Sequence, residues 1–227
     1  GIRELESIRS LDSKTGARIL PLDDRGEEIR IKPDAFIMVY GRGMAVYKRP
    51  TFVLEKVGDV EVWRSIVRDA RSKGREAQII YMGKAHPDDN GGKEALQRIL
   101  HIAKTDPELK GTIIFIEDYD TQVAKAVIKI ATVALNNPEP PLEASGTSGM
   151  KFQLAGKPSV SVLDGWTLEA LKGVFSFVTP KNLLKVLTGV WQFVNKSGKV
   201  IETKETKNIP TNVEEKIDGH VAYECLD

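Results

Sequence analysis

The stretch Ala35-Phe-Ile-Met-Val-Tyr40 decides the fold, because every residue in it is aliphatic or aromatic. An uninterrupted apolar run of this length is typical of a strand that is buried on both faces of a parallel sheet. Further runs of the same kind follow along the chain, at residues 78–82, 112–116, 132–135 and 160–163. The sequence therefore predicts a sheet of buried strands that begins at this stretch.

Helical patterns separate most of these runs. Residues 60–71, 93–103 and 121–130 place apolar side chains three and four positions apart, which is the spacing of one helix face. Strands that alternate with helices predict an α/β fold, a Rossmann-like parallel sheet with helices on both faces. Ligands of such sheets bind beyond the carboxyl ends of the strands, so the segments after the strands are the candidates for a site.

We expect three parts along the chain. Residues 1–31 are polar and irregular, as in a linker or the remnant of an upstream element. Residues 32–195 form the Rossmann-like domain, and residues 196–227 form a C-terminal extension such as a hairpin followed by a tail. Within the domain, the spacing of apolar residues over 180–194 predicts a last amphipathic helix.

Composition narrows the range of partners. The 227 residues carry a formal net charge of +1, which gives no electrostatic reason to expect nucleic acid or an anionic membrane surface. No apolar run approaches the roughly 20 residues of a membrane-spanning helix, and no secretory signal is visible. The single cysteine, Cys225, excludes an intramolecular disulfide and fits a reducing compartment, so we expect a cytoplasmic protein. No group of His, Cys, Asp and Glu has the spacing of metal ligands.

Polar and charged residues follow each predicted strand. They lie at residues 41–49, 83–87, 117–120, 136–151 and 164–166. Because the carboxyl ends of parallel strands share one edge of a sheet, we expect these loops to build one site from distant segments.

The most informative of these loops contains Glu143-Ala-Ser-Gly-Thr-Ser-Gly-Met-Lys151. Small residues and hydroxyls here indicate a loop that enters a helix, and the unpaired backbone N–H groups at a helix entry bind anions. A lysine at such a place either pairs with the anion or forms a Schiff base with a carbonyl cofactor. The segment therefore predicts a phosphate and a covalently held cofactor at one place.

Three blocks of residues resemble the C-terminal half of the α-glucan phosphorylases, the glycogen and maltodextrin phosphorylase family. The blocks are Tyr47-Lys48-Arg49 with Arg42 upstream, Gly83-Lys84-Ala85-His86-Pro87, and Glu117-Asp118-Tyr119 followed by the segment that ends at Lys151. They are collinear with the family pattern from about residue 32 to residue 166, and the last block is the most specific.

The resemblance implies the two-domain GT-B architecture of glycosyltransferases, of which this chain would supply the C-terminal domain. It implies removal of a terminal glucose from an α-1,4-glucan by inorganic phosphate, with release of glucose 1-phosphate. It also implies pyridoxal 5'-phosphate as a Schiff base on the lysine that matches Lys151, with the cofactor's phosphate taking part in proton transfer. Two phosphate groups then lie close together, so cations must surround them.

The resemblance also assigns roles to single residues. Arg42 matches a position that reaches the cofactor phosphate and Lys48 a ligand of the substrate phosphate, which makes these two the candidate catalytic residues. The cofactor-binding candidates are Lys151, Thr147, Ser148, Tyr119 and Arg42, and the substrate-binding candidates are Glu143, Ser145, Gly146 and Lys48. Lys84 and His86 lie in a matching block, but no chemistry is assigned to them.

Each of these roles has a simpler alternative. Thr147 and Ser148 can serve as helix caps, a function that is compatible with phosphate binding. Tyr119 can be a packed core tyrosine, and Glu143 a surface acid. Arg42 and Lys48 can be solvated charges, although two cations at strand ends favour an anion between them.

The chain departs from the family pattern at several positions. Gly43 stands where the family has a second basic residue that holds the substrate phosphate, and a glycine cannot replace a bidentate guanidinium. Glu139 adds a carboxylate where bacterial relatives are basic, which is unfavourable near phosphate. The sequence after Trp166 does not follow the family pattern that we expect there, and the N-terminal domain, which supplies much of the glucan groove, is absent from these residues. An N-terminal domain or partner subunit is therefore expected to complete the cleft.

Two other functions fit the same residues. A nucleotide-sugar-dependent glycosyltransferase of the same architecture would use Glu143 for the ribose and Lys48 for the diphosphate. A non-catalytic glucan-binding or regulatory module would account for Gly43 and Glu139. The position of Lys151 within the Gly-Thr-Ser-Gly loop favours the phosphorylase.

Overall fold

The computed structural model describes residues 19–21, 23, 26, 29–57, 60–117, 120–162, 164–167, 190–194 and 200–205. Two compact units divide the chain, Gly1–Ala134 and Leu135–Asp227, and the boundary falls within strand β7 (Val133–Asn136). Each unit is described by itself below.

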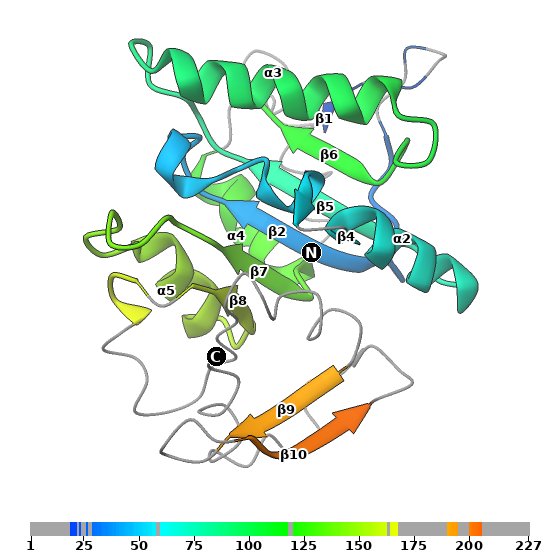
Figure 1. The fold of residues 1–227 in the computed structure, drawn as a ribbon. Coiled ribbons are helices and arrows are strands. Elements are labelled where there is room, and N and C mark those ends of the chain that lie inside the picture. The colour runs from blue at the N-terminus through cyan, green and yellow to red at the C-terminus, as the bar shows by residue number, and fades with distance from the viewer. Residues whose placement is uncertain are drawn as a thin grey trace. The chain divides into compact units, whose positions relative to one another are not determined.

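The first unit is built around β2 (Phe36–Gly41), which contains the stretch that decides the fold (Figure 1). β2 pairs in parallel with β5 (Ala77–Met82) along its whole length and with the start of β7 at Met38 and Val39. β5 pairs in parallel with β6 (Ile113–Ile116). The side chains of Met38, Val39 and Tyr40 are fully buried, so the predicted central strand is confirmed.

Three helices connect these strands: α2 (Val62–Ser72), α3 (Asn90–Thr105) and α4 (Thr121–Ile130). The chain steps from β2 to β5 to β6 and then crosses back, through α4, to the other side of β2. Right-handed crossovers put α2 and α3 on one face of the sheet and α4 on the other, as Figure 1 shows for α2 and α4. The predicted parallel α/β sheet with helices on both faces is therefore correct.

The reversal of strand order lies between β2 and β7, which are neighbours in the sheet. In open α/β sheets the crevice at such a switch point, outside the carboxyl ends of the strands, is where ligands bind. The loop after β2, which begins at Arg42, starts at this edge of the first unit. It contains the short helices η1 (Val46–Lys48) and η2 (Phe52–Leu54) and the small hairpin of β3 (Lys56–Val57) and β4 (Val60–Glu61).

The N-terminal segment supplies a short edge strand. β1 (Ile19–Leu20) pairs antiparallel with β6 and forms the edge of the sheet. A strand of two apolar residues has no detectable periodicity, which is why the sequence pattern missed it. The buried Gln78 side chain ties the following segment to the sheet, since its oxygen accepts the Lys32 N–H at 2.8 Å and its amide group donates to the Arg30 carbonyl at 3.0 Å.

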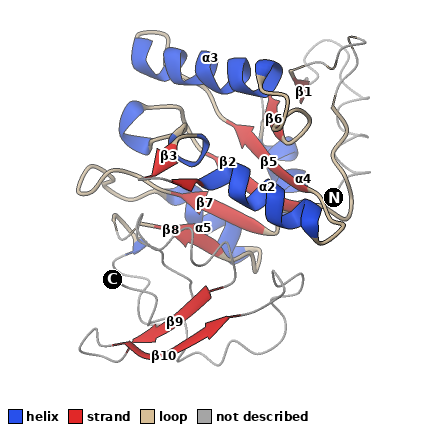
Figure 2. Cartoon of the chain, turned by 45° about the vertical axis from the view of Figure 1, so that its right-hand side comes forward, coloured by secondary structure: helices blue, strands red, loops and turns tan. Residues whose placement is uncertain are grey.

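The second unit contains the end of β7, helix α5 (Thr147–Leu154), strand β8 (Ser159–Ser161) and the hairpin of β9 (Val190–Val194) and β10 (Val200–Glu205) (Figure 2). β8 is bonded to β7 through the buried Asn136, whose carbonyl accepts the Val162 N–H at 2.9 Å and whose amide donates to the Ser161 hydroxyl at 2.7 Å.

The helix predicted over residues 180–194 is wrong at its C-terminal end. Residues 190–194 form β9, which pairs antiparallel with β10, and residues 180–189 lie outside the described part of the chain. The sequence Val-Trp-Gln-Phe-Val at 190–194 is rich in β-branched and aromatic residues, which favour a strand. Pairing with β10 therefore outweighed the helical spacing of a few apolar residues. The observed hairpin is not contained in the predicted extension, because β9 lies wholly before residue 196 and only β10 falls within residues 196–227.

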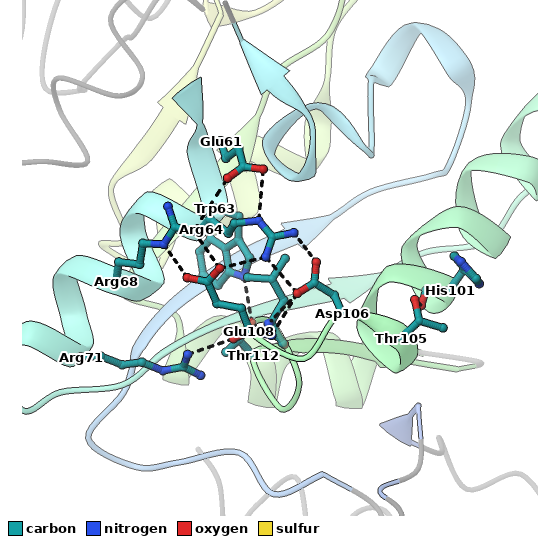
Figure 3. A network of polar contacts seen from close by, with 11 residues as sticks. Glu61, Trp63, Arg64, Arg68, Arg71, His101, Thr105, Asp106, Glu108 and Thr112 are labelled. Carbon is teal, nitrogen blue, oxygen red and sulfur yellow. Dashed lines mark hydrogen bonds and ion pairs between the residues drawn. The ribbon is translucent and has the colours of Figure 1, made fainter. Parts of the chain in front are cut away.

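An ion-pair network fastens the loop between α3 and β6 to helix α2 (Figure 3). Arg64 binds Asp106 through both terminal nitrogens and Glu108 through one. Arg68 pairs with Glu108, and the Trp63 indole N–H donates to the Thr112 hydroxyl at 3.1 Å. The hydrogen bond from Arg64 holds the pKa of Asp106 below its usual range.

Replacing Asp106 by alanine should lower the free energy of unfolding at pH 7 by about 2 kcal/mol, since its carboxylate also accepts the Glu108 and Leu109 N–H groups. A carboxyl whose pKa is depressed by folding contributes stability above its unfolded pKa of about 4, and loses it as the pH falls through the folded value. The difference between wild type and Asp106→Ala in urea unfolding should therefore shrink at pH 3. An equal difference at both pH values would contradict this role of the charge.

Candidate functional site

The loop after β2 presents the candidate cations of the first unit. Arg42 is buried, with 2% of its surface exposed, and Lys48 is half-buried on η1. The Tyr40 hydroxyl lies 3.2 Å from the Lys48 carbonyl oxygen and 3.3 Å from that of Gly43. One buried phenol at the end of β2 therefore holds both ends of the loop that carries Lys48.

The start of α3 closes this loop from another side. Asp89 caps the helix by accepting the Gly92 N–H at 2.8 Å. A Cβ on Gly92 would lie 2.8 Å from the Met44 carbonyl oxygen, and a Cβ on Gly91 would overlap the Val46 side chain. Gly92 is thus required by the close approach of the loop backbone, whereas the exposed Val46 side chain beside Gly91 could shift.

Arg49 follows Lys48 in a left-handed conformation, with φ at +46°. A non-glycine residue there is strained by about 1 kcal/mol or more, a cost that surrounding contacts must offset. The Arg49 guanidinium lies 4.8 Å from the centroid of the Phe52 ring, a distance at which the cation is attracted to the ring. The backbone is therefore turned sharply at the residue after the candidate phosphate ligand.

Tyr40 and Tyr81 offer a matched pair of tests. They are register partners on β2 and β5, with ring centroids 5.3 Å apart. The Tyr81 hydroxyl is buried without a hydrogen-bond partner among the described residues, and burial raises its pKa well above the usual value. Tyr40→Phe should lower the free energy of unfolding by about 1 kcal/mol, whereas Tyr81→Phe should be neutral or stabilising. Urea unfolding checks both, and equal losses would contradict the loop-holding role of Tyr40.

The 83–87 block has a structural role in the described residues. Gly83 lies against the backbone of Arg42. Lys84 is exposed, and its carbonyl accepts the Met44 N–H at 3.2 Å. The exposed His86 ring accepts the Asp88 N–H at 3.2 Å, as expected for a turn. These contacts hold the end of β5 to the Lys48 loop.

In the second unit, Glu143 begins the segment that the sequence singled out. Glu143 is 7% exposed, and its backbone N–H donates to the Asp164 carboxylate at 2.8 Å. Ser145 is exposed, and its carbonyl accepts the Trp166 N–H at 2.9 Å. Gly146 then turns the chain into α5 with φ at +83°. The predicted loop that enters a helix is confirmed.

The start of α5 has features of an anion site. Its N-cap, Gly146, has no side chain to cap the first turn. Thr147 and Lys151 are both exposed and stand four positions apart, so they share one face of the helix. Ser148 is half-buried beside them. Backbone N–H groups and two hydroxyls therefore lie one helical turn before an exposed primary amine.

The predicted residues fall into two groups, one in each unit. Arg42 and Lys48 share the loop after β2, while Glu143, Ser145, Gly146, Thr147, Ser148 and Lys151 share the loop and first turns of α5. Tyr119 lies outside the described residues, and Glu139 is exposed. Within the described residues, no three His, Cys, Asp or Glu side chains gather to hold a metal ion.

Two residues that shape these groups received no role from the sequence, Tyr40 and Asp164, although Asp164 lies in the predicted site loop at 164–166. Tyr40 was counted only as the last apolar residue of a strand, and its hydroxyl carried no signal. Asp164 precedes Gly165 directly after a predicted strand, and an Asp-Gly pair is a turn signal. Its contact with Glu143, 21 positions away, depends on the tertiary fold.

Comparison with known proteins places this chain in a family. Residues 4–179 match the model of the carbohydrate phosphorylase family, and the chain belongs to that family. It is 45% identical over 147 residues to a glycogen phosphorylase of Aquifex aeolicus, covering 65% of this chain and 20% of the relative. It is 43% identical over 143 residues to a maltodextrin phosphorylase of Thermococcus litoralis, covering 63% of this chain and 16% of the relative.

The human liver form of glycogen phosphorylase is more distant, at 25% identity over 173 residues. The aligned region covers 74% of this chain and 20% of the human protein. The chain thus spans a fifth or less of the length of the relatives it matches here. In the part of the chain that the structure describes, no helix is both long and apolar enough to cross a membrane.

Proposed function

We propose that this chain is the cofactor-binding part of an α-glucan phosphorylase. The complete enzyme would use inorganic phosphate to remove a terminal glucose from an α-1,4-glucan and release glucose 1-phosphate, as a cytoplasmic hexosyltransferase. Family membership over residues 4–179 supports the reaction class. The start of α5 carries the proposal for this particular chain, because it combines an uncapped helix entry with an exposed lysine one turn later.

The residues at the start of α5 fit pyridoxal 5'-phosphate. The cofactor carries a phosphate and an aldehyde, which need an anion site and a primary amine. The N–H groups after Gly146, with the hydroxyls of Thr147 and Ser148, suit the phosphate. Lys151, on the face that Thr147 occupies, suits covalent attachment. When bound, the cofactor supplies a phosphate group that takes part in proton transfer.

The other site residues would act on the substrates. We propose that Glu143, Ser145 and Gly146 bind glucose hydroxyls, with the buried Glu143 as an oriented acceptor. Arg42 and Lys48 would balance phosphate charge, Arg42 for the cofactor and Lys48 for the substrate. Cations that are already held in place stabilise the negative charge that accumulates where two phosphates meet. Tyr119 remains a proposed neighbour of the cofactor.

A second domain is needed to complete the substrate cleft for catalysis. The chain spans about a fifth of its longer relatives, and a GT-B enzyme closes two domains on its substrate. We propose that an N-terminal domain or partner subunit supplies the opposite side of the cleft and the rest of the glucan groove. Activity is therefore expected from the chain together with that part, and cofactor binding from this chain by itself.

Titration with pyridoxal 5'-phosphate tests the proposal. The wild-type chain should take up one equivalent with saturable near-ultraviolet or visible absorbance, and Lys151→Ala should lose the covalent absorbance band. Because Lys151 is exposed, its removal should change the free energy of unfolding by about 0.5 kcal/mol or less. Lys157→Ala, a lysine just beyond the same helix, is the matched control and should keep the band. A wild-type chain that remains colourless at saturating cofactor would contradict the proposal.

A further inference from the structure

The turn at residues 164–167 is bonded to the loop at residues 143–146 at two points. One carboxylate oxygen of Asp164 accepts the Glu143 N–H at 2.8 Å, and the other accepts the Gly165 N–H at 2.9 Å. The backbone N–H of Trp166 donates to the Ser145 carbonyl oxygen at 2.9 Å. Two backbone attachments, at Glu143 and two residues later, fix the direction in which the loop leaves Glu143.

The contact between turn and loop leaves no space for a side chain. Gly165 has φ at +59°, and a Cβ there would lie 2.5 Å from the Ser145 carbonyl oxygen and 2.9 Å from that of Glu143. The loop therefore lies directly on the turn, and a shift of the turn moves the loop.

The same turn supports helix α5. A Cβ on Gly149 would lie 3.2 Å from the Trp166 indole nitrogen, and one on Gly146 would lie 3.5 Å from the indole Cδ1. The indole thus packs against the first turn of α5 at two glycines. Asp164, Gly165 and Trp166 together contact both the loop that carries Glu143 and the helix start that carries Thr147 and Ser148.

Asp164 is itself held in a fixed position. It is 5% exposed, and its backbone N–H donates to the Thr167 hydroxyl oxygen at 2.9 Å. That oxygen also lies 2.6 Å from the Asp164 carbonyl oxygen and 3.1 Å from that of Val162, at the end of β8. The backbone of Asp164 is therefore fixed next to the end of β8, and the side chain that binds the loop extends from a fixed point.

We propose that Asp164 is a positioning residue for the cofactor and sugar site, acting through the Glu143 amide. Its carboxylate fixes the position at which the 143–146 loop begins. It thereby orients the Glu143 side chain toward the sugar and the first N–H groups of α5 toward the cofactor phosphate. This inference rests on the proposed function for its ligands, although the geometry lies wholly within the second unit. A small misplacement of binding groups is costly, since a displacement of about 1 Å can lower catalysis about a hundredfold.

The test compares Asp164→Ala with Asp106→Ala. Asp106 also accepts two backbone N–H groups with one carboxylate, but it belongs to the α2 network and not to the site. Amide hydrogen exchange at Glu143 and the Kd for pyridoxal 5'-phosphate are measured at a temperature where every variant is folded. We expect Asp164→Ala to lose protection at Glu143 about tenfold and to weaken cofactor binding about tenfold. Asp106→Ala should lower stability and leave both quantities unchanged.

Asp164→Asn keeps the inference testable if the alanine variant does not fold. The asparagine oxygen can accept one of the two N–H groups and its NH2 group can accept none, so intermediate effects are expected. Equal cofactor Kd values for wild type and both Asp164 variants would overturn the inference and leave the proposed function standing. Equal weakening by Asp106→Ala would also overturn it, since the effect would then be general. If the wild type binds no cofactor, the proposed function fails, and unchanged exchange at Glu143 then overturns the positioning role as well.

Discussion

Gly83→Ala should destabilise the first unit by about 3 kcal/mol or more, or prevent its folding. A Cβ at Gly83 would lie 2.9 Å from the carbonyl carbon of Arg42 and closer still to its oxygen. Both groups are backbone at the ends of paired strands, so neither can move without breaking the β2–β5 pairing. Overpacking against a rigid neighbour typically costs 1–3 kcal/mol and occasionally more. Urea unfolding followed by circular dichroism measures the loss.

Gly43→Ala is the matched control, since Gly43 lies in the neighbouring loop. A Cβ there would lie 3.7 Å from the Lys84 carbonyl oxygen, an ordinary contact, and the residue has no left-handed φ. We expect a change of about 0.5 kcal/mol or less for this variant. If both variants lose a similar free energy of unfolding, the close contact between Gly83 and Arg42 is not the cause of the destabilisation.

Gly43→Arg should raise the affinity of the cofactor-loaded chain for inorganic phosphate by about tenfold to a hundredfold. The family pattern places a basic residue at this position for the substrate phosphate, and an arginine can bind phosphate through two parallel hydrogen bonds. Loss of one such charge in a phosphate site typically weakens binding or catalysis by a factor of this size. A Cβ at Gly43 would make only an ordinary contact, 3.7 Å from the Lys84 carbonyl oxygen, so the backbone there accepts a side chain. Isothermal titration calorimetry measures the affinity.

The charge must be separated from the effect of size. Gly43→Gln adds a side chain of similar reach without the charge and should leave phosphate affinity within about threefold of wild type. If arginine and glutamine give the same affinity, position 43 does not face the phosphate. That result would favour the alternative hypothesis, a non-catalytic module that binds glucan without turnover.

Most of the fold followed from local patterns in the sequence. The runs at 35–40, 78–82 and 112–116 became β2, β5 and β6 because buried parallel strands need apolar residues on both faces. The 121–130 pattern gave α4 with the same bounds, and Asp120 caps it by accepting the Val123 N–H at 2.8 Å. In these segments local preference and tertiary burial agree.

The features that were missed depend on partners distant in sequence. β1 exists because β6 offers an open edge, and β9 exists because β10 pairs with it. The Tyr40 hydroxyl and the Asp164 carboxylate act on loops that only the folded sheet brings to them. For the site, residue type predicted a loop that enters a helix within residues 143–151, whereas the entry at Gly146, the exposure of Lys151 and the contacts that orient them needed coordinates.

Borohydride reduction tests the central claim most directly. The purified chain is saturated with pyridoxal 5'-phosphate, reduced, digested and analysed by mass spectrometry. The account predicts one modified peptide, with the pyridoxyl phosphate group on Lys151. An unmodified Lys151 peptide after saturation, or label spread over exposed lysines such as Lys84, would contradict it.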